Sequence, residues 1–266
     1  MNMSIFLGIL AAGATMWFGV FKSVSNPSFY LDPHAMTLVL GGTVAASLIG
    51  FPLSKLLEVS DSLLAGFFRR KVPDYKVVEQ MYEASIYFRK FRDLLNSVEF
   101  SHPFMAEGFS LLRNESFTEK HLQEILTKRI AAYKKKLHSD AKILTAIAKF
   151  PPAFGLLGAS TGMIAMMLNL NKGGSQSIGP AMAIALVATF WGIALSNILL
   201  LPLADYANKI AQDDTHTRLI IMEALILIKK NEDPHVMVEI LKSHLPSIDR
   251  KRIRIMRSPT PFHRAA

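Results

Sequence analysis

Three hydroxyl side chains, Ser160, Thr161 and Thr189, are the residues in the apolar middle of this chain that could offer hydrogen bonds to a passing ion. They lie within residues 150–204, where Lys172 is the only charged residue. Pathways for ions through membranes contain ionisable or ion-binding residues, and a hydroxyl does not release a proton at neutral pH. The stretch therefore has no group of its own that could carry a proton. A buried Thr hydroxyl commonly bonds to its own helix, so periodicity alone assigns none of the three a role.

Prolines mark the ends of this stretch. Pro151 and Pro152 stand where an apolar helix would begin, and a helix tolerates proline in its first turn. Pro202 stands near the end of the next apolar helix, and the residues beyond it still have a helical pattern, which predicts a kink at Pro202. Pro152 and Pro202 are expected at the same membrane face. These two prolines either simply mark the ends of two spans or form a flexible region that transmits motion into the cytoplasm.

The hydropathy pattern predicts an all-α membrane protein with four transmembrane helices. Half of the residues are hydrophobic, and a bilayer crossing requires about 20 apolar residues. The charge-free windows are 1–21, 33–54, 150–171 and 173–204. We therefore expect transmembrane helices in 1–54, a helical cytoplasmic domain in 55–149, transmembrane helices in 150–204, and a cytoplasmic helical extension with a basic tail in 205–266.

The distribution of basic residues predicts the orientation. Of 30 Lys and Arg residues, 17 lie in segment 55–149 and 11 in segment 205–266. Basic residues near span ends stay in the cytoplasm, so both termini and the middle segment are expected on the cytoplasmic side. The formal net charge of +9 is then a topology signal and not a nucleic-acid surface. No basic segment precedes the first span, so we expect it to remain in the protein as a transmembrane helix and not to be cleaved as a signal peptide.

Small residues recur at helical spacing in all four predicted spans. Close helix packing in membranes uses such residues. They are Gly8, Ala12, Thr15 and Gly19, then Gly41, Gly42, Ala45, Ala46 and Gly50, then Gly155, Gly158 and Gly162, and finally Ala185, Thr189, Gly192 and Ser196. These stripes pack either against one another within the chain or against another subunit or an axial partner.

The charged segments have helical patterns of their own. Helices are expected over 55–71 and 77–100, from the cap at Thr118 to about His138, and from the fourth span to Lys230, where 231–234 would end it. Arg89, Lys90 and Glu99 form a charged cluster that is either a solvated face or a docking surface.

Enzyme chemistry is not predicted, and neither is a cofactor. The sequence has no cysteine, its eight histidines lack metal-ligand spacing, and no phosphate-binding glycine loop is present.

At these motifs the chain resembles the A subunit of the bacterial flagellar motor stator, the MotA/PomA family, over nearly its whole length. The matching residues are 151–158, 177–186 and 201–205, with Asp32–Pro33, 41–43 and 231–234 in support. The resemblance implies a homopentamer around two copies of a B subunit of the MotB/PomB type, whose transmembrane aspartate supplies the missing ion-binding group. It also implies that Thr189 is the pore threonine and that Pro152 and Pro202 are the two coupling prolines.

The resemblance further implies a place in the bacterial cytoplasmic (inner) membrane. It also implies that ion flow turns the A ring and that its cytoplasmic domain pushes a rotor switch-complex protein. The rotor-contacting motif is only partly kept: Arg89 and Glu99 survive, with Lys90 beside Arg89, whereas other charges are shifted or lost. Ala159 stands where sodium-driven members have Thr, which favours protons as the transported ion. Ser160 and Thr161 add polarity beside it, so sodium remains the alternative ion.

Two rival interpretations are an ExbB/TolQ-like unit that energises outer-membrane or envelope processes and a membrane scaffold that moves no ion. The first rival has a single span before the large cytoplasmic segment, whereas two are predicted here. Composition does not separate the second from a motor subunit.

Overall fold

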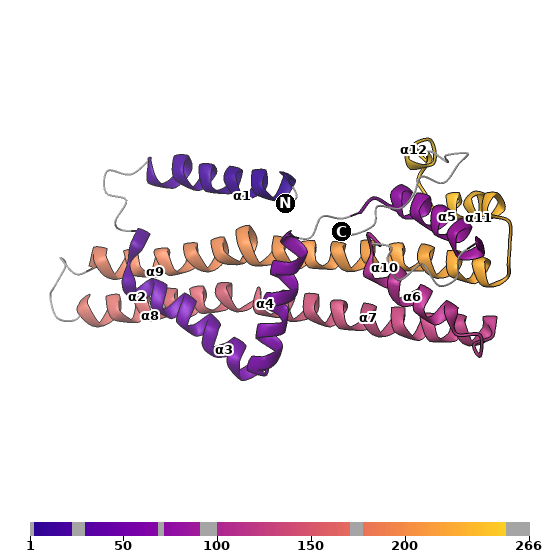
Figure 1. Cartoon of the computed structure of the whole chain (residues 1–266). Coiled ribbons are helices and arrows are strands. Elements are labelled where there is room, and N and C mark those ends of the chain that lie inside the picture. Colours follow the sequence, from indigo (N-terminus) through magenta and orange to yellow (C-terminus); the bar gives the residue numbers. More distant parts are fainter. Residues whose placement is uncertain (1–2, 23–29, 69–71, 91–99, 171–177, 254–266) are drawn as a thin grey trace, which may run out of the picture. The chain divides into compact units, whose positions relative to one another are not determined.

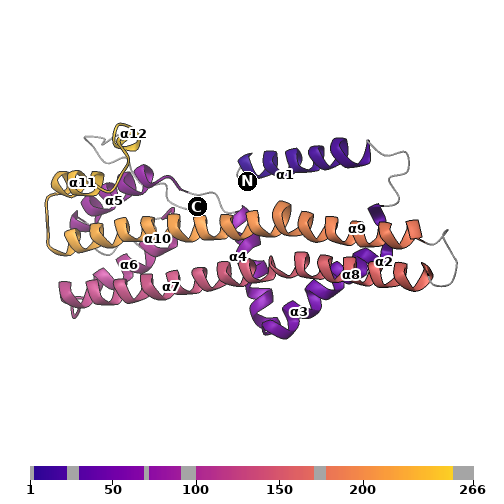
Figure 2. The ribbon, with the colours of Figure 1, turned by 180° about the vertical axis from the view of Figure 1, so that it is seen from behind.

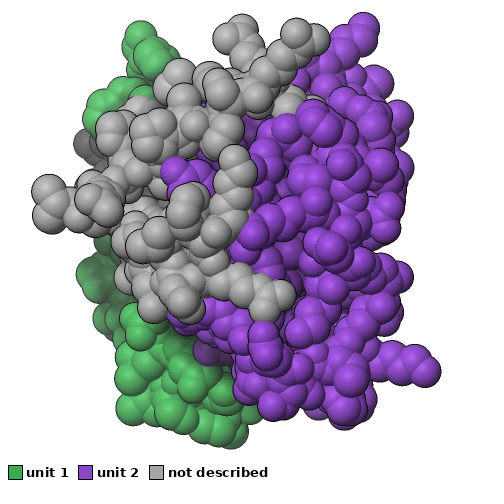
Figure 3. Space-filling view, turned by 45° about the vertical axis from the view of Figure 1, so that its right-hand side comes forward, with its two compact units in different colours: residues 1–70, 137–210 green, residues 71–136, 211–266 purple. Residues whose placement is uncertain are grey.

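The computed structural model describes residues 3–22, 30–68, 72–90, 100–170 and 178–253. Every regular element in these ranges is a helix (Figure 1), which confirms the all-α prediction. The chain divides into two compact units (Figure 3), one formed by 1–70 with 137–210 and the other by 71–136 with 211–266. The division falls within two long helices, α7 (Glu119–Ile147) and α10 (Leu201–Lys229).

The first unit contains the apolar helices. They are α1 (Met3–Met16) with the π-helical η1 (Trp17–Phe21), α2 (Pro33–Met36), the π-helical η3 (Thr37–Gly41), α3 (Gly42–Gly50), α4 (Leu53–Phe68), α8 (Phe150–Leu170), α9 (Ile178–Ala194) and the π-helical η6 (Leu195–Leu200). Three helical runs of the described chain are long and apolar enough to cross a membrane: 33–50, part of 119–168, and part of 178–229. The α1–η1 run is not among them, so the span predicted in residues 1–21 stays a prediction.

The closest packing in this unit is between α8 and α9. The two helices lie side by side in Figure 1 and also in Figure 2, which shows the ribbon from behind. A Cβ added to Gly155 would lie 2.9 Å from the carbonyl oxygen of Ala188. One added to Gly192 would lie 2.6 Å from the carbonyl oxygen of Pro151. Any side chain at Gly155 or Gly192 would therefore push the two backbones apart. On these faces the small residues serve helix packing within one chain.

The second unit contains the amphipathic helices. They are α5 (Asp74–Lys90), α6 (Pro103–Arg113), α11 (Pro234–Lys242) and α12 (Ser247–Arg250), with residues 119–136 of α7 and 211–229 of α10. Its core contains Met81, Phe104, Met105, Leu122, Leu126, Ile220, Ile221, Leu225, Met237 and Leu241, all less than 2% exposed. Burial of such side chains stabilises a fold by about 1.5–3 kcal/mol each.

Several predicted helix ends are confirmed and others are not. The helix after Thr118 begins at Glu119 as expected, but it continues to Ile147 and not to about His138. The reason is that Ile143 and Leu144 are buried against α4, so the apolar pattern does not end at the charged residues near 138. The helix expected over 77–100 is described over Asp74–Lys90, and 91–99 lie outside the described residues. Helix α6 was not predicted.

Candidate functional site

Thr189 lies at the contact between α8 and α9. Its side chain is half-buried, and its hydroxyl lies 3.1 Å from the Ala185 carbonyl oxygen of its own helix. It also lies 3.5 Å from the Gly155 carbonyl oxygen of α8. The absence of a side chain on Gly155 permits this approach, since a Cβ there would lie 3.3 Å from the Thr189 Cα. The hydroxyl thus donates to backbone carbonyls, and its oxygen keeps the lone pairs that could accept a bond from a hydrated ion.

The other three residues predicted for an ion pathway lie on α8. Ser160 is exposed and donates to the Leu156 carbonyl at 3.0 Å. Thr161 donates to the Gly158 carbonyl at 2.9 Å. Both hydroxyls therefore bond to their own helix, as short polar side chains in helices often do. Ala159 is half-buried. The structure joins Thr189 to α8 at Gly155, one turn before Ala159, and not through the two α8 hydroxyls.

The two predicted coupling prolines both lie in the first turn of a helix. Pro152 is half-buried in the first turn of α8, just after α7 ends at Ile147. Pro202 is exposed and is the second residue of α10. It has no N–H for the carbonyl of Ile198, and the six residues before α10, η6, are π-helical. The kink predicted at Pro202 stays a prediction.

Ser196 has a contact that the sequence analysis missed. It was predicted only as a member of a small-residue stripe. In the structure it is buried, and its hydroxyl donates to the Ala148 carbonyl at 2.6 Å. The signal in the sequence is Pro152, because a proline leaves the carbonyl four residues earlier without its helical partner.

Arg89 is the one member of the predicted charged cluster whose contacts the structure describes. Its guanidinium donates to the carbonyl of Asn231 at 2.9 Å and to that of Glu232. These carbonyls follow the end of α10, where Asn231 has the left-handed φ of 61° that commonly ends helices. A cation at this end also faces the negative end of the helix dipole. Lys90 is the last residue of α5, and Glu99 lies outside the described residues.

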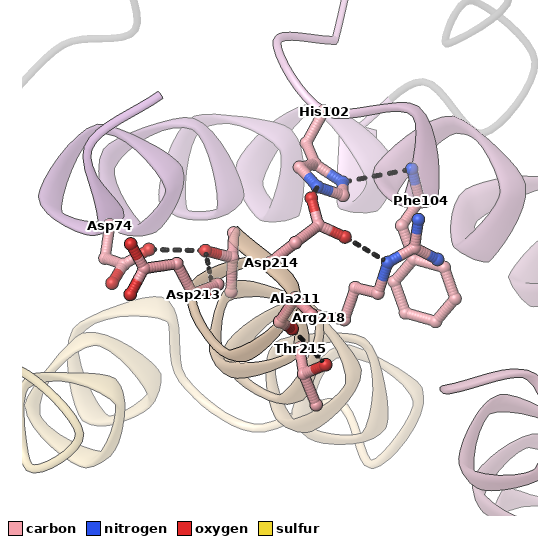
Figure 4. Close-up of polar contacts among 9 residues, drawn as sticks. Asp74, His102, Phe104, Ala211, Asp213, Asp214, Thr215 and Arg218 are labelled. Atoms are coloured by element: carbon pink, nitrogen blue, oxygen red, sulfur yellow. Dashed lines mark hydrogen bonds and ion pairs between the residues drawn. The ribbon is translucent and has the colours of Figure 1, made fainter. Parts of the chain in front are cut away.

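Asp214 is the centre of a buried polar network in the second unit (Figure 4). One of its carboxylate oxygens lies 3.1 Å from Nε2 of His102, and the other lies 2.7 Å from Nε of Arg218. Nδ1 of His102 accepts from the backbone N–H of Phe104 at 3.2 Å and thereby caps α6. The Arg218 guanidinium stacks over the Tyr133 ring at 3.6 Å. The i, i+4 spacing of Asp214 and Arg218 could have predicted their pairing.

The electrostatics of Asp214 follow from these contacts. Burial alone would raise the pKa of its carboxyl. The hydrogen bonds from His102 and Arg218, together with the positive charge of Arg218, outweigh burial and hold the pKa of the carboxyl well below its usual range. Asp214 is therefore ionised at any physiological pH and balances the charge of Arg218, which is only 9% exposed.

Comparison with known proteins defines the class. Residues 96–219 match the MotA/TolQ/ExbB proton channel family. This segment includes the α8–α9 pair, Pro152, Pro202 and part of the second unit's core, but not the first apolar helices.

Several relatives match more of the chain than the family model does. The chain is 26% identical over 248 residues to "Chemotaxis protein PomA" of Vibrio alginolyticus, covering 92% of this chain and 96% of that protein. It is 27% identical over 217 residues to "Uncharacterized protein YtxD" of Bacillus subtilis, covering 80% and 78%. A chain in the solved flagellar MotAB stator complex from Bacillus subtilis has the same fold, with a TM-score of 0.83, 22% identity, and coverage of 93% and 97%. The resemblance to the MotA/PomA family is confirmed by these relatives, and residues 96–219 are similar to the MotA/TolQ/ExbB proton channel family.

Replacement of Arg89 tests its contact with the end of α10. We expect Arg89→Gln to lower the free energy of unfolding by about 1 kcal/mol, because two carbonyls lose a charged donor. Chemical unfolding of the purified chain, followed by circular dichroism, measures the change. The control is Lys76→Gln, which removes a charge from an exposed position of the same helix and should leave stability unchanged. Equal effects of the two substitutions would contradict the helix-end contact.

Replacement of Asp214 tests the buried network. We expect Asp214→Asn to destabilise the fold by about 3–5 kcal/mol, since it leaves the buried Arg218 charge uncompensated. The control is Asp249→Asn, which breaks an exposed pair with Arg252 and should cost at most about 1 kcal/mol.

The same network predicts a dependence of stability on pH. The folded pKa of Asp214 is lowered, so its contribution is complete above the unfolded carboxyl pKa of about 3.9 and is lost as the pH falls further. Wild-type stability should therefore decline below about pH 4 more steeply than that of Asp214→Asn. If the stability of the two proteins falls equally steeply below pH 4, the lowered pKa of Asp214 is contradicted.

Proposed function

We propose that this chain is an A-type stator subunit of the bacterial flagellar motor, which couples ion flow to torque on the rotor. The observation that carries the proposal is the closely packed α8–α9 pair, which has no ionisable side chain in residues 150–170 or 178–204. A proton or sodium ion crossing beside such helices needs a binding group from another chain. The MotA/TolQ/ExbB match over this pair and the fold shared with a MotAB stator complex support the same conclusion.

The proposed topology has four transmembrane helices and both termini in the cytoplasm. Three apolar helical runs support three spans, and the fourth would be the α1–η1 run over 3–21. An even number of spans keeps the basic segments 55–149 and 205–266 on one side, as the positive-inside rule requires. The segment 55–149 would then form the cytoplasmic domain that pushes the rotor.

The proposed partner is a B subunit of the MotB/PomB type whose transmembrane aspartate holds the ion. In a pentamer of this chain around two B subunits, the exposed apolar side chains of α8 and α9 would face other helices or lipid. They include Leu156, Met163, Ile164, Met182, Leu186 and Ile193, each more than half exposed in the single chain. Contacts of this kind depend on packing, because lipid itself is apolar.

The proposed ion is the proton, with sodium as the alternative. By the family resemblance, Ala159 supports the proton as the transported ion. Its polar neighbours Ser160 and Thr161 are the reason that sodium is the alternative. Pro152 and Pro202 are the proposed coupling residues. Arg89, Lys90 and Glu99 are the proposed rotor contacts, although Arg89 also binds the end of α10.

An ExbB/TolQ-like role in energising the envelope is the second candidate, because the matching family includes those proteins. The motility relative that covers 92% of this chain favours the motor.

Swimming separates the motor from the second candidate. Cells that have flagella but no other stator should swim when they express this chain with its cognate B subunit. Control cells receive the same pair with the B-subunit aspartate replaced by asparagine. Paralysis despite both proteins in the membrane would contradict the motor function. Repetition in medium without sodium identifies the ion, because a proton-driven motor keeps its speed.

Replacement of Thr189 tests its role in the ion pathway. We expect Thr189→Val to reduce torque severalfold while the complex still assembles, because the change keeps the side-chain volume and removes the hydroxyl. Thr189→Ser, which keeps the hydroxyl, should retain more torque. The control is Thr37→Val, because Thr37 is an exposed hydroxyl that donates to its own helix at 2.7 Å. Unchanged speed in Thr189→Val cells would show that Thr189 serves packing alone.

A further inference from the structure

The second proline of the α7–α8 junction creates a specific hydrogen-bonding demand. In a continuous helix the carbonyl of Ala148 would accept the N–H of residue 152. Residue 152 is proline and has no N–H. Ala148 is 1% exposed, and buried backbone carbonyls are almost always paired. The fold therefore requires another donor at this carbonyl.

Ser196 supplies that donor from a distant part of the chain. Its hydroxyl lies 2.6 Å from the Ala148 oxygen, and its side chain is 3% exposed. The two α8 hydroxyls, Ser160 and Thr161, bond only to carbonyls of their own helix. Ser196 instead reaches from η6 to the start of α8.

The position of Ser196 along its own helix is also unusual. It lies in the π-helical segment Leu195–Leu200, which precedes Pro202. The backbone N–H of Leu201 bonds to the carbonyl of Ser196, five residues back, which is the π-helical pattern. π-helical turns inside α-helices often mark functional sites. Ser196 thus belongs to the π-helical segment before Pro202, and its hydroxyl also pairs with the Ala148 carbonyl, which Pro152 leaves without a helical donor.

We propose that Ser196 is a positioning residue whose hydroxyl replaces the missing amide of Pro152 and fastens the η6 segment to the start of α8. The two proline-marked positions are then one mechanical unit, and a movement at either must strain or break this hydrogen bond. The hydrogen bond stands independently of any function. Its role in transmitting motion rests on the proposed stator function.

A double-mutant cycle in the full chain, purified with its B subunit, tests the pairing. Pro152→Ala restores an N–H that can bond to the Ala148 carbonyl. We expect Ser196→Ala to lower the thermal midpoint by about 2–4 °C in the wild-type background. In the Pro152→Ala background the loss should be less than half as large, because the carbonyl then has its own helical donor.

Ser160→Ala is the matched control for the cycle. It removes a hydroxyl that bonds to its own helix, and its effect should be the same in both backgrounds. An equal loss for Ser196→Ala in the two backgrounds overturns the pairing. If Ser196→Ala alone fails to assemble, recovery of the complex by added Pro152→Ala supports the pairing, and failure of both overturns it.

Swimming speed at matched protein levels tests the mechanical role. Ser196→Ala should slow cells, whereas Ser160→Ala should not. A positive cycle with unchanged speed overturns the mechanical role and leaves the hydrogen bond standing. If the wild-type pair does not support swimming, the stator function fails and the cycle still decides the pairing, since it is read from unfolding alone.

Discussion

The close contact between the backbones of α8 and α9 is the constraint on which the apolar part of the protein depends. Lipid is as apolar as leucine, so helices in a membrane gain little from burying apolar side chains and depend on packing and hydrogen bonds. Gly155 and Gly192 permit the backbones to touch. Once they touch, the Thr189 hydroxyl is within reach of the Gly155 carbonyl. Further along the pair, Ser196 bonds to Ala148 at the start of α8.

A helix pair held in this way is well suited to a mechanical role and poorly suited to acid–base chemistry. Its polar groups are hydroxyls and backbone carbonyls, and neither changes charge at physiological pH. In the second unit, by contrast, Asp214 and Arg218 form a buried ion pair and neutralise each other. In the proposed motor the chain would supply the moving helices, and a partner would supply the charge that binds the ion.

Local signals explain what could be predicted from the sequence. Pro151 and Pro152 marked the start of α8, and residues 231–234 marked the end of α10, because both effects act within one helical turn. The bond from Ser196 to Ala148 spans 48 residues and that from Arg89 to Asn231 spans 142. The periodicity of the sequence does not predict hydrogen bonds between residues so far apart, since these depend on which helices pack together. The absent amide of Pro152 shows that a carbonyl needs a donor, but it does not identify the donor.

The position of Arg89 also changes how its charge must be interpreted. A basic residue on an exposed helix is readily assigned to a charged partner, and the family resemblance encourages that assignment. Here the guanidinium already donates to two carbonyls at the end of α10, so its loss would alter the α10–α11 turn as well as any surface charge. Reversal of that charge would combine both effects. A rotor contact at Arg89 is therefore established only by a substitution that preserves the helix-end bond or by a compensating change on the rotor, because loss of torque alone has two physical explanations.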